Sequence, residues 1–301
     1  MPEGFIERWI TNKKKGRLRS AFLCLWGCDI MRWGLFTCPY QRMPLESAFA
    51  DASAFGYDYI ELWGGRPHAY PPDLLRGESE TVRRLAEKYE IPVEIYTPEH
   101  NAYPFNYMMG THRQWEDAMD YLACAIRCGK DLGVAYVLIS MGHSGFLPYS
   151  ERKKRLICSL ENLRREAEAL EQPVVLETLT PFESDTCTHP EELADVLDRI
   201  SSPLLFGMCD VVVPFVIGED PLNYARVLGN RLVHLHLADS NGVDETHLIF
   251  GEGRMKAEKI LRDFQAAGYN SRATLELVTH YIDDPSGAAE RILKKAKEFQ
   301  L

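Results

Sequence analysis

The stretch LLFGMCDVVVPFVIGEDPLNYARVLGNRLVHLHL, residues 204–237, contains two short apolar runs separated by a helical pattern. The runs at 204–210 and 232–237 have the length of buried strands, and residues 222–228 between them have helical spacing. A strand, a helix and a second strand in this order form a right-handed crossover between parallel strands. The stretch therefore predicts a parallel α/β fold.

The same alternation of apolar runs and helical patterns continues from Trp33 to the end of the chain. Eight candidate strands alternate with eight candidate helices, and eight strands is the number that closes a barrel. We therefore expect a single (β/α)8 TIM barrel. An open doubly wound sheet is the alternative, which is disfavoured because no Gly-x-Gly-x-x-Gly or Walker sequence follows a strand. The expected strands are 33–37, 59–63, 93–97, 136–140, 174–178, 204–210, 232–237 and 273–278, and the expected helices are 45–55, 78–89, 113–132, 150–170, 190–200, 222–228, 255–267 and 285–299.

The composition is that of an ordinary globular protein, with 46% of the 301 residues hydrophobic and 26% charged. The formal net charge of −10 disfavours a nucleic-acid partner, because the mean field repels a phosphate backbone. No apolar run approaches the roughly 18 residues of a membrane span, and the eight cysteines match no disulfide framework or zinc spacing. We expect a cytoplasmic protein with reduced thiols, a small-molecule partner, the capacity to form a homo-oligomer, and neither a membrane nor a nucleic-acid partner.

Residues 1–30 differ from the rest of the chain. A basic stretch at 13–19 precedes a short apolar run at 21–28, which resembles the first parts of a signal peptide. We reject a signal peptide because the run is short, charged residues follow it and no cleavage site is evident. We expect residues 1–30 to be either a translated leader before an authentic start at Met31 or a disordered peripheral arm, and residues 31–301 to form the catalytic barrel.

Four successive candidate strands carry a polar group, namely Glu177, Asp210, His236 and Glu276. The catalytic groups of a TIM barrel lie at the C-terminal ends of its strands, and a carboxylate inside an apolar strand is costly unless it is paired or bound to a metal. The spacings of 33, 26 and 40 residues each correspond to about one strand and helix, so we expect all four groups to meet at the barrel mouth. We assign His234 to the opposite face of its strand from His236, as a packing residue or a support for the site.

The four groups together favour a metal site. An ion pair with Arg or Lys explains any one of them, but structural pairing does not require an acceptor on every successive strand. Three carboxylates and one imidazole, with no thiolate, suit Mn²⁺, Mg²⁺ or Co²⁺ better than a structural zinc. We expect Mn²⁺ first, with Co²⁺, Mg²⁺ and Ni²⁺ as alternatives, held by Glu177, Asp210, His236 and Glu276.

The expected geometry also indicates a reaction. Glu177 and Glu276 are three strands apart in an eight-membered ring, so they face each other across a ligand. A metal that binds the oxygens of a hydroxyketone makes the adjacent C–H acidic and stabilises the enediolate. One glutamate can then remove a proton from one face while the other returns it to the opposite face. The pattern predicts an epimerase with Glu177 and Glu276 as its two catalytic bases.

At these residues the sequence resembles the xylose-isomerase-like TIM barrels, and within them the ketose 3-epimerase group. Longer motifs resemble the members of this group that act on fructoselysine: Gly34-Leu35-Phe36-Thr37-Cys38, Ile60-Glu61-Leu62-Trp63-Gly64-Gly65-Arg66-Pro67-His68-Ala69, Tyr96-Thr97-Pro98-Glu99, Leu179-Thr180-Pro181-Phe182-Glu183-Ser184, and Thr246-His247 ahead of Gly251-Glu252-Gly253-Arg254-Met255. The resemblance covers residue 33 to about residue 299. It implies reversible, metal-dependent interconversion of fructoselysine and psicoselysine by inversion at C3.

Two departures from the free-sugar epimerases bear on the substrate. A histidine three residues after Asp210 and an arginine six residues after His236 are expected in those enzymes, and this chain has Val213 and Gly242 there. The resemblance therefore implies a ketosamine, whose amino-acid tail carries both signs of charge. The expected substrate-binding residues lie in the mouth loops and are Glu183, Arg66, His68, His143 and Asp239.

Four other functions are compatible with parts of this pattern. A general ketose 3-epimerase and an aldose–ketose isomerase acting on a free sugar remain as alternatives, because both proceed through an enediolate. A nuclease for abasic DNA is disfavoured because too few of the nine histidines lie where a three-metal cluster needs them. A non-catalytic sugar-binding protein would leave two opposed glutamates without a role.

Overall fold

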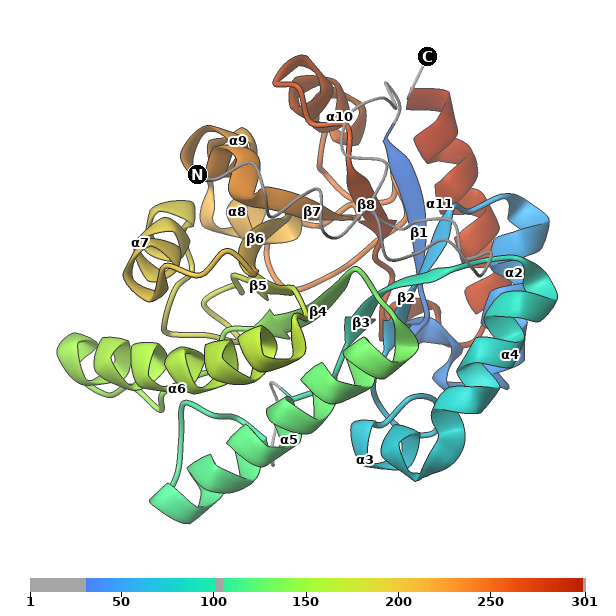
Figure 1. Ribbon diagram of the computed structural model, residues 1–301. Helices are drawn as coiled ribbons and strands as arrows, with labels where there is room; N and C mark the ends of the chain where they lie inside the picture. The colour runs from blue at the N-terminus through green and yellow to red at the C-terminus, as the bar shows by residue number, and fades with distance from the viewer. Residues whose placement is uncertain (1–30, 101–104, 300–301) are drawn as a thin grey trace, which may run out of the picture.

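The computed structural model describes residues 31–100 and 105–299, and its centre is a closed barrel of eight parallel strands in chain order (Figure 1). The first and last strands close the ring through pairs such as Trp33 with Ala273. The expected (β/α)8 TIM barrel is therefore confirmed, whereas residues 1–30 lie outside the described residues. The strands are β1 (Arg32–Phe36), β2 (Tyr59–Trp63), β3 (Val93–Thr97), β4 (Tyr136–Ser140), β5 (Val174–Glu177), β6 (Leu205–Asp210), β7 (Leu232–Leu237) and β8 (Arg272–Leu275).

Helices surround the barrel (Figure 1). Those that follow the expected helices are α2 (Leu45–Phe55), α4 (Ser79–Tyr89), α5 (His112–Leu132), α6 (Tyr149–Leu170), α7 (Pro190–Ile200), α9 (Leu222–Leu228), α10 (Ala257–Ala266) and α11 (Pro285–Phe299). Two short helices, α3 (Pro71–Asp73) and α8 (Val212–Ile217), were not expected. Helix α8 follows β6 directly because the carboxylate of Asp210 accepts the backbone N–H of Val212 at 2.9 Å, and this turn reverses the chain at the strand end.

The last strand is shorter than expected. Strand β8 ends at Leu275, so Glu276 is the first residue beyond it. The backbone N–H of Glu276 still donates to the carbonyl of Leu237 at 3.0 Å, and the chain then turns into a short 3₁₀ helix at Thr279–Tyr281. Glu276 therefore lies at the rim of the barrel, where its backbone is fixed by the neighbouring strand.

The barrel interior is filled in layers. Five apolar side chains, none more than 1% exposed, form its middle: Tyr59, Ile95, Leu138, Val175 and Met208. At the N-terminal end of the strands, the carboxylate of Glu94 accepts hydrogen bonds from Arg32 at 2.6 Å and from Arg272 at 2.5 Å. Because this end is filled, the functional groups are to be sought at the C-terminal ends of the strands.

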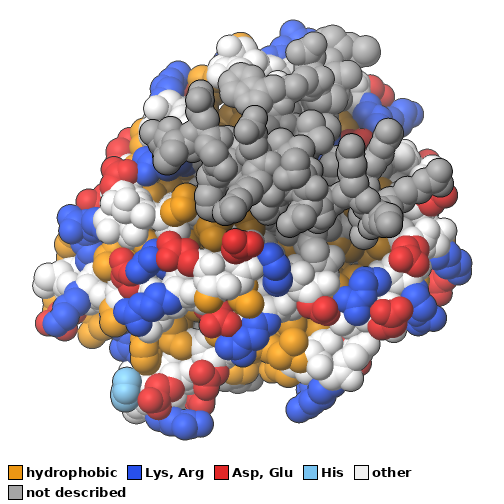
Figure 2. All heavy atoms as spheres, viewed as in Figure 1, with side chains coloured by type: hydrophobic (Ala, Val, Ile, Leu, Met, Phe, Trp, Pro, Cys, Tyr) orange, Lys and Arg blue, Asp and Glu red, His pale blue; other side chains and the backbone are white. Residues whose placement is uncertain are grey.

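The surface gives few further indications of a partner. On the face seen in Figure 2, the basic and acidic side chains of the described residues are interspersed. Across the described ranges, no helix combines the length and the apolar character needed to cross a lipid bilayer. The six cysteines in this part of the chain form no disulfide with one another.

Candidate functional site

The C-terminal ends of the last four strands bring Glu177, Asp210, His236 and Glu276 together. Glu177 and Asp210 are the last residues of β5 and β6, and His236 in β7 lies in register with Asp210. Nδ1 of His236 lies 3.2 Å from Oε1 of Glu177 and 3.0 Å from Oε2 of Glu276. All four residues are less than 10% exposed. The sequence-predicted cluster thus exists as a contiguous group of buried side chains.

His247 joins this cluster from a loop. Its Nε2 lies 3.3 Å from Oδ2 of Asp210 and 3.1 Å from Oε2 of Glu276. The loop is held to the end of β7 by a two-way backbone pairing of Asp239 with Leu248, at 2.7 Å in both directions. His247 was not among the residues predicted for the site, although it stands in one of the motifs of the resemblance, because a loop residue has no periodicity that would place it.

The cluster forms the floor of a cavity of about 310 Å³ at the barrel mouth. Its walls combine apolar side chains with further polar ones: Phe36, Cys38, Trp63, Thr97, Pro98, Glu99, His100, Ser140, Leu179, Glu183, Glu245 and Val278. With the floor, the lining includes six carboxylates and three imidazoles, and no lysine or arginine of the described residues lines it. A cavity of this charge favours a cation among its ligands.

The carboxylates perturb one another's ionisation. Burial raises the pKa of Glu177, whereas the charges of His236 and His247 outweigh burial and lower the pKa of Glu276 below its usual range. At the mouth, desolvation of the carboxyl group and the charge of Glu177 raise the pKa of Glu183 to about 7. Burial and the charge of Glu183 raise the pKa of Glu245 to about 9. The site therefore concentrates more negative charge than its own imidazoles neutralise.

The hydrogen bonds of the two histidines show what the cluster lacks. Nε2 of His236 donates to Oε1 of Glu61 at 2.9 Å, and Nδ1 of His247 donates to the carbonyl of Glu245 at 3.0 Å. Each ring therefore turns its other nitrogen toward carboxylate oxygens, and Nδ1 of His236 and Oε2 of Glu276 make no hydrogen bond in the part of the chain described. Without a second proton on the rings, acceptors face acceptors at about 3 Å and repel each other, and either that proton or a metal cation removes the repulsion. The donor set of carboxylates and imidazole fits a divalent metal ion.

His234 does not lie on the opposite face of β7 from His236, as was expected from the sequence. It is two residues from His236, and residues at i and i+2 share one face of a strand, so the assignment to opposite faces was wrong. Both rings point into the barrel, with centroids 4.9 Å apart, and both donate to Glu61. His234 is fully buried beneath the site.

Of the residues expected to bind substrate, Glu183 lines the cavity and Asp239 does not. The carboxylate of Asp239 is completely buried and accepts backbone N–H groups from Gly251, Gly253 and Met255 at 2.7 to 3.1 Å. Both of its oxygens are thereby used to shape the loop between β7 and α10. Asp239 organises the cavity wall from behind.

Arg66, His68 and His143 also lie outside the cavity lining. Arg66 makes a bidentate ion pair with Asp73 at 2.7 and 2.9 Å, and its side chain is 64% exposed. His68 is buried, with Nε2 2.9 Å from the carbonyl of Met43. His143 accepts the backbone N–H of Gly145 on its Nδ1 at 2.9 Å. The ordinary structural roles of these groups account for their positions.

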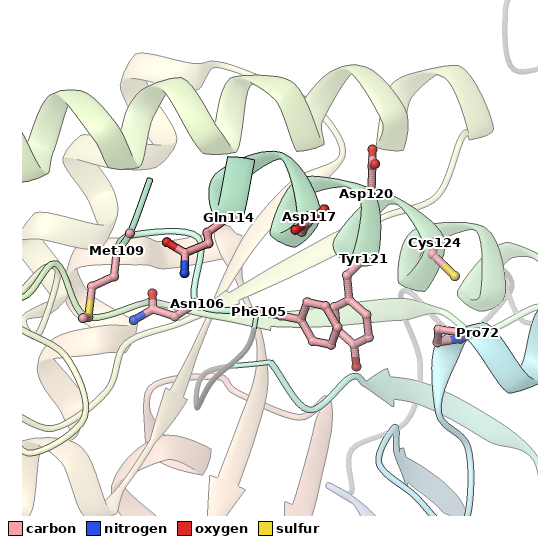
Figure 3. Close-up of a pocket in the computed structure, with 10 residues that line it drawn as sticks. Pro72, Phe105, Asn106, Met109, Gln114, Asp117, Asp120, Tyr121 and Cys124 are labelled. Carbon is pink, nitrogen blue, oxygen red and sulfur yellow. The ribbon is translucent and has the colours of Figure 1, made fainter. Parts of the chain in front are cut away.

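A larger cavity, of about 700 Å³, lies outside the barrel against α5 (Figure 3). Phe105 and Tyr121 stack face to face on its floor, with ring centroids 3.9 Å apart, and Asp117 and Asp120 stand on its rim. It contains no group of side chains comparable to the cluster at the strand ends. Size alone therefore does not identify the chemical site.

Comparisons with known proteins agree with this geometry. The chain is 41% identical over 266 residues to the fructoselysine 3-epimerases of Shigella flexneri and Escherichia coli O157:H7, which covers 88% of this chain and 96% and 97% of theirs. Among solved structures, D-psicose 3-epimerase from Clostridium cellulolyticum H10 is similar with a TM-score of 0.73 and 15% identity over 90% of this chain and 99% of that one. D-allulose 3-epimerase from Methylomonas sp. is similar with a TM-score of 0.74 and 15% identity over 89% and 97%. At such identities the solved structures show the fold alone.

The family assignment rests on the barrel from α2 onward. The model of the xylose isomerase-like TIM barrel family matches residues 49–299, which includes all the polar groups of the cavity floor. The resemblance stated from the sequence motifs is therefore confirmed at the level of the family. This chain belongs to the xylose isomerase-like TIM barrel family.

Proposed function

We propose that this protein is a divalent-metal-dependent sugar epimerase that inverts C3 of a ketosamine, interconverting fructoselysine and psicoselysine. The observation that carries the proposal is the convergence of two glutamates, Glu177 and Glu276, on one buried imidazole at the floor of a sugar-sized cavity. The 41% identity to fructoselysine 3-epimerases supports the substrate, because it extends over nearly the whole of both chains.

Glu177, Asp210, His236 and Glu276 would hold the metal ion. When bound, a divalent ion supplies a Lewis acid that polarises the carbonyl of the sugar and stabilises the enediolate. The four side chains come from four adjacent strands, so the barrel fixes their relative positions without substrate. The burial of the cluster keeps bulk water from competing for the donors.

The proton transfers are assigned to the two glutamates. Glu177 at the end of β5 and Glu276 after β8 approach the centre of the mouth from different sides of the ring. One carboxylate accepts the proton from C3 on its side of the substrate, and the other donates a proton to the opposite side. Inversion at one carbon requires two such groups, and a single fixed base returns the proton to the side from which it came.

The charge of the mouth supports an aminated substrate. Glu183 and Glu245 add two acidic groups above the floor, whose ionised forms a bound cation would favour, and the described lining has no cationic side chain to hold a phosphate or an acidic sugar. Fructoselysine carries a secondary ammonium next to the reacting part of the sugar, and a charge-assisted hydrogen bond from it to Glu183 would position C3 over the floor. Val213 is buried in α8, where a free-sugar epimerase is expected to offer a polar group.

The proposal is tested by following the substrate carbon that exchanges with solvent. Fructoselysine, fructose, psicose and tagatose are each incubated with the Mn²⁺-loaded enzyme in D₂O, and deuterium incorporation is located by NMR. We expect deuterium at C3 of fructoselysine, together with psicoselysine. Deuterium at C1 would assign an aldose–ketose isomerase, equal turnover of free ketoses would assign a general ketose 3-epimerase, and no incorporation would refute an enzymatic role on these sugars.

A further inference from the structure

Glu61 is a completely buried carboxylate that the proposed chemistry does not use. It lies in β2, beneath the cavity floor, and its oxygens accept three hydrogen bonds. Oε1 accepts from Nε2 of His236 at 2.9 Å and from Oγ1 of Thr97 at 2.6 Å, and Oε2 accepts from Nε2 of His234 at 2.9 Å. A buried charge requires such partners, because an unpaired one costs several kcal/mol.

Stability alone does not account for this arrangement. The neighbouring interior layer is apolar and well packed, and replacing a buried ionic group by apolar side chains of similar volume is often neutral or stabilising. The polar group therefore needs a role beyond filling space. Its contact with a residue of the cavity floor, His236, indicates what this role is.

The hydrogen bond from His236 fixes the orientation and the tautomer of the ring. An ionised carboxylate only accepts, so Nε2 of His236 must carry the hydrogen. Nδ1 is then left to face Glu177 and Glu276, at 3.2 and 3.0 Å. A carboxylate behind a metal-binding histidine orients the ring and increases its basicity.

Two further contacts keep Glu61 itself in place. His234 donates to the oxygen that His236 does not use, and Thr97 donates to the other one from β3. A rotation of the Glu61 carboxylate would break at least one of these bonds within a packed interior. The three donors come from β3, which neighbours β2, and from β7, which β1 and β8 separate from β2 in the ring, so the carboxylate links two parts of the barrel wall below the site.

We propose that Glu61 is a positioning residue that holds His236 with Nε2 protonated and Nδ1 directed at the metal-binding carboxylates, and that His234 and Thr97 hold Glu61 in turn. This inference rests on the proposed function, because it assigns His236 as a metal ligand. It predicts that Glu61 governs metal affinity without contacting the ion or the substrate.

The first experiment measures Mn²⁺ binding to the metal-free protein by calorimetry. Glu61→Gln keeps the shape but offers one acceptor oxygen to two imidazoles, and we expect its Kd for Mn²⁺ to rise about 10- to 100-fold, as for other supports of metal ligands. Tyr59→Phe is the matched control: Tyr59 lies two residues earlier on the same strand, is equally buried, and loses a hydrogen bond of 3.0 Å to Thr274 that touches no site residue. Its Kd should stay within about twofold of wild type.

Folding is checked by circular dichroism and thermal unfolding of each metal-free variant. If Glu61→Gln does not fold, Thr97→Val takes its place, because it removes only one of the three bonds to Glu61 and should weaken Mn²⁺ binding to a smaller extent in the same direction. An unchanged Mn²⁺ affinity in a folded Glu61→Gln protein would overturn the inference.

The second experiment separates this inference from the proposed function. NMR of ¹⁵N-labelled histidine in the metal-free wild-type protein reports whether Nε2 of His236 carries a hydrogen. In the proposed arrangement Nε2 carries this hydrogen in both the neutral and the protonated ring. We expect a slowly exchanging Nε2–H resonance that is lost or exchanges faster in Glu61→Gln. A bare Nε2 refutes the role of Glu61 whether or not metal binds, whereas a protected Nε2–H in a protein that binds no Mn²⁺ supports it and refutes the metal site instead.

Discussion

Replacing Glu276 by Gln tests the assignment of two bases. Oε2 of Glu276 lies 3.0 Å from Nδ1 of His236 and 3.1 Å from Nε2 of His247, and the side chain is 11% exposed. Glutamine fits the same space and keeps an oxygen donor, but it cannot accept the proton of C3. Loss of a general base costs about 10²- to 10⁴-fold in rate, which corresponds to about 2.7 to 5.5 kcal/mol of transition-state free energy.

The expected effect on metal binding is smaller. Glutamine removes one negative charge but keeps an oxygen that can bind the ion, while Glu177, Asp210 and His236 remain. Saturating Mn²⁺ should therefore restore occupancy but not turnover. This difference allows a loss of chemistry to be distinguished from a loss of metal.

The assay follows both epimers separately in D₂O at saturating Mn²⁺. In Glu276→Gln, net epimerisation should fall at least about 100-fold, while one epimer still exchanges its C3 hydrogen through Glu177. Glu177→Gln is the matched counterpart and should preserve exchange in the other epimer only. Epimerisation by Glu276→Gln at a rate near that of the wild type, or loss of exchange from the same epimer in both variants, would refute the two-base reasoning.

Four further outcomes are expected. Chelation should abolish activity and lower the unfolding temperature, because the remaining carboxylates repel one another, and Mn²⁺ or Co²⁺ should restore both; full activity in demetallated protein would contradict this. The kcat/KM for fructoselysine should exceed that for free ketoses by at least about 100-fold, or about 2.7 kcal/mol, and Glu183→Gln should reduce this ratio. If the ratio of the two kcat/KM values were unchanged in Glu183→Gln, Glu183 would be an exposed side chain with no contact to the substrate. A chain that starts at Met31, which is itself buried, should fold and turn over normally; loss of stability or solubility would show that residues 1–30 are packed structure. The charges of Arg32 and Arg272 outweigh burial and lower the pKa of Glu94 below its usual 4.5. The stability that Glu94 contributes is therefore present above about pH 4.5 and is lost as the pH falls through the pKa of the folded state. Acid unfolding of Glu94→Gln should depend less steeply on pH than that of the wild type, and identical acid transitions would contradict this role of Glu94.

The barrel was predictable because its pattern is local. Each strand is a short apolar run between amphipathic helices, and seven of the eight expected strands match the observed ones to within one residue at each end. The exception is β8, which ends three residues early because the chain turns over the rim after Glu276. Strand order and parity then bring Glu177, Asp210 and His236 to one level without further information.

The loop residues were not predictable in this way. Asp239 and Arg66 are charged residues just beyond strand ends, the pattern expected for substrate contacts, but Asp239 is saturated by backbone N–H groups and Arg66 by Asp73. Conversely, His247 reaches the cluster only because the Asp239 to Leu248 pairing folds its loop back over the mouth. Such placements depend on tertiary hydrogen bonds between segments, for which single-sequence periodicity carries no signal.

More acidic side chains line the cavity than the stability of the fold requires, and this excess indicates that the cavity binds cations. Six carboxylates line one cavity of about 310 Å³ without a described lysine or arginine among them. Ion pairs formed for stability place opposite charges together, as the pairing of Glu94 with Arg32 does at the other end of the same barrel. In the proposed function, the opposite charge at the mouth is supplied from outside, by a metal ion at the floor and by an ammonium group near Glu183 and Glu245. In this proposal the two ends of the barrel differ in where their positive charge comes from. Arginine side chains of the chain itself supply it at the N-terminal end, whereas bound ligands supply it at the mouth, so the mouth is the end that can select among substrates.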